Sequence, residues 1–342
     1  MWSVIGHIKA VNLLRQSIER GNFSHAYLFV GPPHVGKMTL AKNMAQALNC
    51  LTIDPPCGIC APCLRISEGK HSDIQVTELE QGGETEASKT RISVEQVDQI
   101  LHSVNLPPFE GRYKVFIIDG VEHMSLQAAN RMLKTLEEPV SKVVFILLSA
   151  NEAMVPATVI SRCQRIELFP LPLTEVETAL ITRWGVAPEK AKLLARLSGG
   201  RLGWAVTLAQ DESWLQQRNE WLDDWLEVLE ADMDARFTYV AKMAERFSQN
   251  RETVRQKLLL LVDWWRDMLL VKTGSGDMIA NIDRTVTVQE MASLFSLTQT
   301  RQFIGNVETA MRQLRQNVNP QLVLEVLMLN VPERGKVKRV VT

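Results

Sequence analysis

The residues whose types and spacing could carry chemistry begin near position 27. A short apolar run, Tyr27-Leu28-Phe29-Val30, leads into the segment Gly31-Pro32-Pro33-His34-Val35-Gly36-Lys37. Two glycines at this spacing let backbone N–H groups turn toward phosphate oxygens, the lysine supplies positive charge, and the following helix adds its N-terminal dipole. The sequence therefore predicts a strand, a phosphate-binding loop and a helix.

The position after the lysine bears on hydrolysis. A Ser or Thr hydroxyl there would complete the shell of a bound Mg²⁺, but Met38 offers a thioether, which is a poor ligand for a hard cation. Thr39 carries a hydroxyl one residue later. The candidate nucleotide-binding residues of the loop are Gly31, Gly36, Lys37 and Thr39. These residues indicate a nucleotide-type fold whose hydrolytic chemistry is weakened.

A second apolar segment ends in a carboxylate. Residues Lys114–Asp119 are typical of a buried strand, and we expect Asp119 at its end to hold Mg²⁺ through water. In nucleotide-hydrolysing proteins with such a phosphate loop and strand, the next residue is a glutamate that polarises the attacking water. Here it is Gly120, which has no side chain, and we expect Glu122 to point elsewhere. A second part of the hydrolytic apparatus is therefore missing.

Four of the five cysteines lie close together in the sequence. Cys50, Cys57, Cys60 and Cys63 form a C-x6-C-x2-C-x2-C pattern, interrupted by prolines and a glycine that turn the chain so that the sulfurs can converge. Four thiolates at such spacing suit tetrahedral Zn²⁺, and the alternative is a set of free, buried cysteines. Because four protein ligands saturate the metal, we expect a structural zinc knuckle rather than a catalytic site.

Length and charge bound the classes of function. The chain has 342 residues, 46% of them hydrophobic, and 38 basic against 39 acidic residues leave a net charge of −1. A near-neutral chain has no global field for tight, independent nucleic-acid binding, although a local patch stays possible. The N-terminus lacks the pattern of a signal peptide, and no apolar run approaches the ~20 residues of a membrane span. We expect a cytoplasmic protein.

The elements that must position these residues follow from the hydrophobic pattern. Helical periodicity precedes the first strand, Ser93 and Ser125 are placed to cap two helices, and Val143–Leu148 is typical of another buried strand. Beyond residue 168 the alternation of strands and helices gives way to helices alone. Their tryptophans at helical spacing are typical of a core rather than a base-stacking platform. The expected fold class is α/β plus all-α.

At this point the sequence resembles a known family. The segment Ala129-Asn130-Arg131-Met132-Leu133-Lys134-Thr135-Leu136-Glu137-Glu138-Pro139 resembles the signature of the bacterial DNA polymerase III clamp-loader subunits, which are AAA+ proteins. The phosphate loop, the four cysteines and the Asp119 strand occur in that family's order, and Ile160-Ser161-Arg162-Cys163 matches its Ser-Arg-Cys motif. The resemblance implies four regions: an AAA+ P-loop domain with a parallel sheet and a zinc insertion at 50–63 (1–168), a helical lid domain (169–210), a helical oligomerisation collar (211–335) and a basic tail (336–342).

The resemblance also implies roles for single residues. Arg162 is implied to be an arginine finger that reaches the γ-phosphate of ATP bound by a neighbouring subunit, and the alternative is an arginine paired with a local carboxylate. Motor subunits of the family should carry a further arginine at about Gly203, where Arg201 is the nearest one here. With Met38 and Gly120, this makes three weakened ATPase positions. The chain also ends after the collar, so it is most similar to the family's delta-prime type, a stator-like subunit.

The implied partners are the gamma/tau-type ATPase subunits and delta, and through the complex the sliding clamp and primed DNA, with no membrane. We expect ATP or ADP, if the loop binds it, to be held without hydrolysis, so that this chain serves the DNA-directed DNA polymerase III holoenzyme without intrinsic ATPase activity. One alternative is an active gamma/tau-type motor in which Thr39 supplies the missing hydroxyl. The other is a zinc-dependent nucleic-acid-binding module on a degenerate P-loop scaffold, which the near-neutral charge disfavours.

Overall fold

A computed structural model describes residues 2–79, 92–316 and 318–333 of the chain. The chain divides into two compact units, one formed by residues 1–179 with 200–204 and the other by residues 180–199 with 205–342. The predicted basic tail at 336–342 lies outside the described residues. All three boundaries between the units fall inside the predicted lid at 169–210, so the limits of lid and collar stay predictions.

In the residues that the structure describes, the first unit is built on one parallel sheet of five strands in the order β2-β3-β4-β1-β5. The strands are β1 (Ala26–Val30), β2 (Ile74–Thr77), β3 (Lys114–Asp119), β4 (Val143–Ser149) and β5 (Gln164–Glu167). Because parallel strands end at the same edge of a sheet, the loop after β1 and the carboxylate at the end of β3 lie at one edge. β4 separates these two strands.

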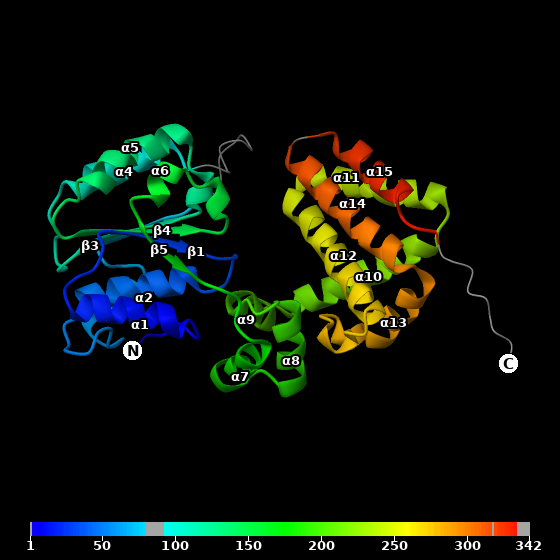
Figure 1. Ribbon diagram of the computed structural model, residues 1–342, viewed down its shortest axis with the longest axis horizontal. Coiled ribbons are helices and arrows are strands. Elements are labelled where there is room, and N and C mark those ends of the chain that lie inside the picture. Colours follow the sequence, from blue (N-terminus) through cyan, green and yellow to red (C-terminus); the bar gives the residue numbers. More distant parts are fainter. Residues whose placement is uncertain (1, 80–91, 317, 334–342) are drawn as a thin grey trace. The chain divides into compact units, whose positions relative to one another are not determined.

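Helices cover both faces of this sheet (Figure 1). Side chains alternate across β1: Tyr27 and Phe29 pack against one helical layer, while Leu28 and Val30 pack against the other. The first layer holds α1 (Ile8–Glu19), α2 (Lys37–Asn49) and α3 (Ala61–Ser67). The second holds α4 (Val94–Val104), α5 (Leu126–Glu137) and α6 (Ala157–Ile160). The central strands are apolar on both faces because neither face meets water.

The helix caps predicted at Ser93 and Ser125 are confirmed. Ser93 and Gln96 form a reciprocal capping box at the start of α4, and the Oγ of Ser125 accepts the N–H of Ala128 at 3.1 Å. The segment predicted as a lid begins with α7 (Leu173–Trp184). Two further helices, α8 (Pro188–Leu197) and α9 (Leu202–Gln210), complete the segment predicted as a lid.

The second unit is helical throughout its described residues. Its described residues contain α8, most of α9 and the six α-helices that follow them in the chain. These are α10 (Glu212–Glu230), α11 (Met233–Gln249), α12 (Arg251–Lys272), α13 (Thr285–Leu294), α14 (Leu297–Arg315) and α15 (Pro320–Leu329). Its core includes Trp225, Trp264 and Trp265, each at most 1% exposed, so the predicted core role of the tryptophans is confirmed. The predicted fold class, α/β plus all-α, is confirmed as well. Within the described ranges, no helix has the length and apolar character needed to cross a membrane.

Candidate nucleotide pocket and cysteine cluster

The two glycines of the phosphate loop are needed for different reasons. At Gly31 a Cβ atom would stand 2.3 Å from the backbone oxygen of Leu168, so any side chain would collide with the strand end beside it. Gly36 has a φ of 114°, a left-handed conformation that disfavours residues with a Cβ, and it stands directly before α2. The loop backbone thus takes a path that other residues would strain.

Lys37 is held inside this loop. It is 8% exposed, and its Nζ donates hydrogen bonds to the backbone oxygens of Gly31 at 2.6 Å and Pro32 at 2.9 Å. Burial lowers the pKa of the ammonium, while the negative charges of Asp119 and Glu122 act in the opposite direction. The lysine therefore faces two carboxylates from the end of β3 and the turn that follows it.

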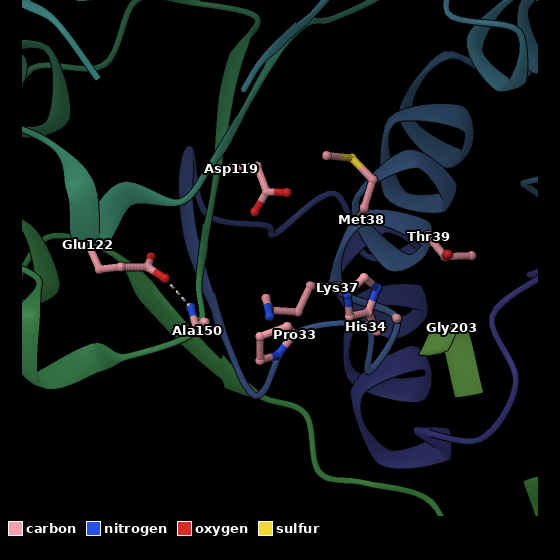
Figure 2. Close-up of a pocket in the computed structure, with 10 residues that line it drawn as sticks. Pro33, His34, Lys37, Met38, Thr39, Asp119, Glu122, Ala150 and Gly203 are labelled. Carbon is pink, nitrogen blue, oxygen red and sulfur yellow. Dashed lines mark hydrogen bonds between the residues drawn. The ribbon is translucent and has the colours of Figure 1, made fainter. Parts of the chain in front are cut away.

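These groups line one cavity of about 350 Å³, shown in Figure 2. The lining residues are Pro33, His34, Gly36, Lys37, Met38, Thr39, Asp119, Glu122, Ala150 and Gly203. Burial raises the pKa of Asp119, and the charge of Lys37 counteracts that rise. The structure thus brings Gly36, Lys37, Thr39 and Asp119 together at one pocket. Gly31 does not line this pocket, but its backbone oxygen accepts a hydrogen bond from Lys37.

Met38 and Thr39 leave α2 in different directions. Figure 2 shows the Met38 side chain on the Asp119 side of the helix and the Thr39 side chain pointing away from Asp119. Met38 is half-buried and packs against the core of the first unit, whereas Thr39 is exposed. A thioether therefore stands on the side where a cation held by Asp119 would need an oxygen ligand.

Glu122 does not point elsewhere, and that expectation is wrong. Gly120 has a φ of 77° and starts the short 3₁₀ helix Val121–His123, which turns the chain back as soon as β3 ends. Glu122 is consequently only 9% exposed and lines the pocket, and its Oε1 accepts the N–H of Ala150 at 2.9 Å (Figure 2). The glycine directly after the strand, Gly120, was the sequence feature that could have indicated this turn.

Gly203, at about the position where the resemblance implies an arginine in motor subunits, contacts the phosphate loop directly. Its N–H donates to the backbone oxygen of His34 at 2.9 Å, and a Cβ atom at this position would lie 2.8 Å from the same oxygen. Next to it, the rings of His34 and Trp204 lie 5.4 Å apart. Burial lowers the pKa of His34, and the positive charges of Arg201 and Lys37 lower it further. Position 203 therefore has no room for a side chain unless the loop backbone moves.

Arg162 follows α6 at the surface of the first unit and is paired locally. Its Nε donates to Oε1 of Glu137 at 2.8 Å, its Nη2 contacts the same oxygen, and its Nη1 donates to the backbone oxygen of Thr158 at 2.8 Å. The structure therefore contains the ion pair that was the alternative to an arginine finger. Glu137 belongs to the segment that carried the family resemblance. The Arg162 side chain is 30% exposed, and ion pairs of such exposure contribute about 0–1 kcal/mol, so the pairing leaves the guanidinium able to exchange partners.

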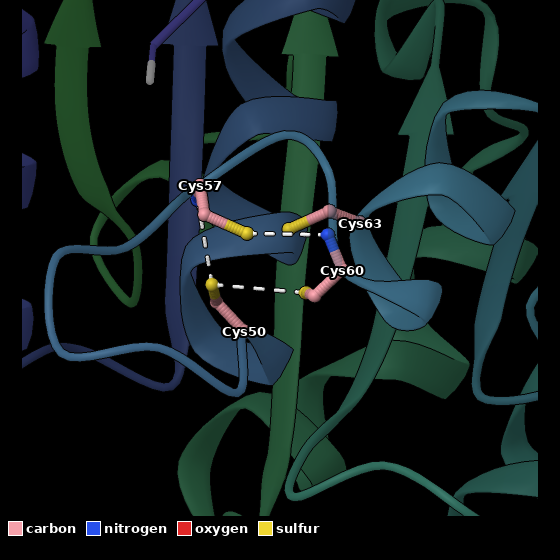
Figure 3. Close-up of side chains that lie close together, drawn as sticks. All are labelled: Cys50, Cys57, Cys60 and Cys63. Carbon is pink, nitrogen blue, oxygen red and sulfur yellow. Dashed lines mark hydrogen bonds between the residues drawn. The ribbon is translucent and has the colours of Figure 1, made fainter.

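The four cysteines of the predicted knuckle converge (Figure 3). The Sγ atoms of Cys50, Cys57, Cys60 and Cys63 all lie within 4.8 Å of one another, and those of Cys50 and Cys60 are 3.9 Å apart. Four sulfurs around a tetrahedral Zn²⁺ would be separated by about 3.8 Å, as follows from Zn–S distances of about 2.3 Å. The donor set therefore fits zinc in number, type and spacing.

Backbone N–H groups aim at the sulfurs of the cluster. The N–H of Cys57 donates to Sγ of Cys50 at 3.4 Å, and the N–H of Cys60 donates to Sγ of Cys57 at 3.3 Å. Hydrogen bonds from the backbone N–H groups of Ile59 and Cys60 lower the pKa of the Cys57 thiol to about 6, which favours the thiolate that a metal binds. Burial instead raises the pKa of Cys63 within the cluster, and it raises the pKa of Cys163, outside the cluster, to about 12.

Two family profiles match the chain. A profile described as "DNA polymerase III, delta subunit" covers residues 6–172, and one described as "DNA polymerase III, delta subunit, C terminal" covers residues 212–333. The chain belongs to the family of DNA polymerase III subunits. Its pocket and its cysteine cluster both lie within the first of these matches.

Individual relatives carry the names of different subunits. The Bacillus subtilis DNA polymerase III subunit delta' is 28% identical over 95% of this chain and 96% of its own. The subunit tau of the same organism is 27% identical over 96% of this chain, which spans only 60% of tau. A solved structure of a DNA polymerase III gamma subunit-related protein from Thermotoga maritima covers 94% of this chain and 99% of its own, with 14% identity and a TM-score of 0.44. Delta' and tau match at similar identity, so family membership leaves the type of subunit open.

Proposed function

We propose that this chain is a clamp-loader subunit of the delta-prime type, which helps to open the sliding clamp and place it on primed DNA. In this proposal it supplies Arg162 to ATP bound by a neighbouring gamma/tau-type subunit and hydrolyses no ATP itself. The observation that carries the proposal is its own pocket. Lys37 and Asp119 are present there, but Met38 stands on the Asp119 side of α2, and Gly120 places no carboxylate directly after Asp119.

The chain's own pocket is suited to holding a nucleotide rather than cleaving it. Gly31 and Gly36 shape the loop, and Lys37 would turn from the loop carbonyls to phosphate oxygens. A bound Mg²⁺ would supply charge neutralisation for those phosphates. Gly203 holds the loop through the oxygen of His34, a position from which a motor subunit would extend an arginine. At positions 38, 120 and 203, three groups that would take part in hydrolysis are thus replaced by Met, Gly and Gly, which cannot do so.

Arg162 is chemically suited to act in trans. Its guanidinium is permanently charged and planar, and its exposed pairing with Glu137 is weak enough for it to turn to a neighbour's phosphate. In other nucleotide hydrolases such fingers accelerate the reaction by about 10³–10⁵. That range corresponds to roughly 4–7 kcal/mol of the barrier. The chain would thereby control hydrolysis at a neighbour's site.

The remaining features take structural and assembly roles in this proposal. Zn²⁺ held by Cys50, Cys57, Cys60 and Cys63 would order a segment that exposes Ile53 and Ile59 to solvent. Residues 211–335 would form the oligomerisation collar with delta and the gamma/tau-type ATPases, in the cytoplasm. The nucleic-acid-binding alternative gains no support from the exposed side chains of the cysteine segment, because its most exposed large residues are apolar.

The test is the DNA-stimulated ATPase of the reconstituted clamp-loader ring with single changes in this subunit. We expect Arg162→Ala and Arg162→Lys to reduce turnover strongly, because the facing site loses about 10³-fold or more. We expect Lys37→Ala to have little effect. Arg165→Ala is the matched control, since Arg165 is a nearby exposed arginine that pairs with Glu152 and Glu167. Turnover that depends on Lys37 and not on Arg162 would contradict the proposal.

One observation favours the second candidate, an active gamma/tau-type motor. Glu122 lines the pocket, so a carboxylate is present although residue 120 is glycine. If Glu122 polarised the attacking water, the isolated chain would hydrolyse ATP, and both Lys37→Ala and Glu122→Gln would abolish that turnover. We expect the isolated chain to show no turnover above a Lys37→Ala preparation.

A further inference from the structure

One oxygen of the pocket lacks a partner. Oε1 of Glu122 accepts the N–H of Ala150, but Oε2 is buried and has no hydrogen-bond partner among the described residues. The side chain as a whole is 9% exposed. Leaving a charged oxygen buried without a partner is unfavourable, so native proteins normally supply a donor or a cation at such a place. This oxygen therefore indicates that a group is to be bound.

The charges around the pocket indicate which kind of group this is. Among the ten lining residues, Asp119 and Glu122 are the carboxylates and Lys37 is the only permanent cation. The negative charges of both carboxylates already act on the ammonium of Lys37, and its Nζ donates hydrogen bonds to two loop carbonyls. Two negative charges thus face one positive charge whose hydrogen bonds are largely used. A cation, and not a free anion, restores the balance.

We propose that Glu122, together with Asp119, binds a divalent cation of the Mg²⁺ or Mn²⁺ type in this pocket, in place of the loop hydroxyl that Met38 lacks. Carboxylate oxygens are the ligands that these hard cations prefer. The inference rests on the proposed function only in taking the pocket as the nucleotide site.

The backbone fixes the Glu122 carboxylate in advance. The left-handed Gly120 turns the chain after β3, and the hydrogen bond to Ala150 ties the carboxylate to the end of β4. Such preorganisation is what a cation site needs, because no side-chain ordering remains to be done on binding. A carboxylate that is shared between a backbone N–H and a cation is also unavailable as a general base. The cation site and the silent ATPase are therefore compatible.

The competing explanation is that Glu122 only clamps the segment after β4. The variant Glu122→Gln separates the two roles, because the amide oxygen can still accept the N–H of Ala150 while the negative charge is lost. Asp119→Asn removes the other carboxylate, and Met38→Ser adds the hydroxyl that the loop lacks. Glu138→Gln, at an exposed glutamate outside the pocket, is the matched control.

The experiment titrates the full chain, with its zinc in place, with Mn²⁺ and follows the electron paramagnetic resonance signal of free Mn²⁺, with and without ADP. We expect one Mn²⁺ per chain and a loss of affinity of at least about tenfold in Glu122→Gln and in Asp119→Asn. Met38→Ser should tighten binding and Glu138→Gln should leave it unchanged. Mn²⁺ should also raise the affinity for ADP in the wild type but less in Glu122→Gln.

Two outcomes would overturn the inference. If Glu122→Gln binds Mn²⁺ as the wild type does, Glu122 is a clamp and no ligand. If the wild type binds no Mn²⁺ at millimolar concentration with or without ADP, the site does not exist. Both results leave the dependence of the ring ATPase on Arg162 unaffected, and loss of that dependence would leave the Mn²⁺ titration unaffected. Failure of the site and failure of the proposed function are thus distinguishable.

Discussion

At the scale of single residues, Asp73 shows how one buried carboxylate holds a loop of the first unit. It stands directly before β2, is 2% exposed, and accepts the N–H groups of Phe109, Glu110 and Gly111 at 2.7, 2.9 and 2.7 Å. Burial acts to raise its pKa, but the three hydrogen bonds outweigh burial and bring the pKa below its ordinary value. Asp73 therefore fixes the segment that leads into β3.

We expect Asp73→Asn to lower the free energy of unfolding of the first unit by about 1–3 kcal/mol at pH 7, because an amide cannot accept all three N–H groups. A carboxyl whose pKa is depressed in the folded state stabilises above its unfolded pKa of about 3.9, and this stabilisation is lost as pH falls through the folded pKa. The difference between wild type and variant should therefore shrink below about pH 4. Hydrogen exchange of β3 peptides, compared between wild type and Asp73→Asn at several pH values, measures this difference in stability.

The control for this prediction is Asp54→Asn, which removes an 84% exposed carboxylate paired with Arg15. Exposed pairs contribute about 0–1 kcal/mol, so its effect should be small. Equal effects of the two substitutions at pH 7 would contradict the role assigned to Asp73.

At the scale of elements, backbone conformation decides where this chain tolerates a side chain. Gly305 lies inside α14, and a Cβ atom there meets nothing within 4 Å. Gly120 instead has a φ of 77° at the turn after β3, where its conformation and not its surroundings excludes other residues. The same chemical change should therefore have opposite effects in the two places.

We expect Gly305→Ala to stabilise the second unit by about 0.5–1 kcal/mol, because alanine loses less backbone entropy in a helix. Gly120→Ala should destabilise the first unit by roughly 1–2 kcal/mol, which is the penalty of a left-handed residue with a Cβ. Denaturant titration, followed by hydrogen exchange in α14 and β3, gives both values. A stabilising Gly120→Ala would show that the turn relaxes to another conformation.

At the scale of the whole molecule, the two units have separate hydrophobic cores and the cysteine cluster belongs to only one of them. A bound metal adds stability to the unit whose folded state binds it. Zinc should consequently affect the first unit and leave the second unit unchanged.

We expect the purified chain to contain one Zn²⁺, and chelation to lower the unfolding temperature of the first unit without changing that of the second. Each kcal/mol lost should correspond to about 2–4 °C for a unit of this size. Cys60→Ser should reproduce the effect of chelation, whereas Cys163→Ser, outside the cluster, should retain the metal. Metal analysis and calorimetry decide this, and equal metal content in the two variants would exclude the site.

The sequence alone determined the features that depend on local pattern. The spacing of Gly31, Gly36 and Lys37, the apolar strand ending at Asp119 and the cap at Ser93 each involve residues that are neighbours in the chain. Dihedral preferences and short-range hydrogen bonds between such neighbours favour these elements whatever the distant contacts are. The cysteine cluster could be predicted from the sequence for the same reason, because the four cysteines are close enough in the chain for their sulfurs to meet.

Only the tertiary structure decided how the pocket is completed. Glu122 reaches the pocket through the turn at Gly120, whose φ is 77°, and through its hydrogen bond to Ala150 at the end of β4. The contact of Gly203 with His34 joins residues that are far apart in the sequence. The sequence likewise does not say which carboxylate pairs with Arg162. The packing of α5 against α6 brings Glu137 to it. Periodicity and propensity describe the chain locally, whereas these contacts are set by the packing of separate elements, so no local pattern contains them.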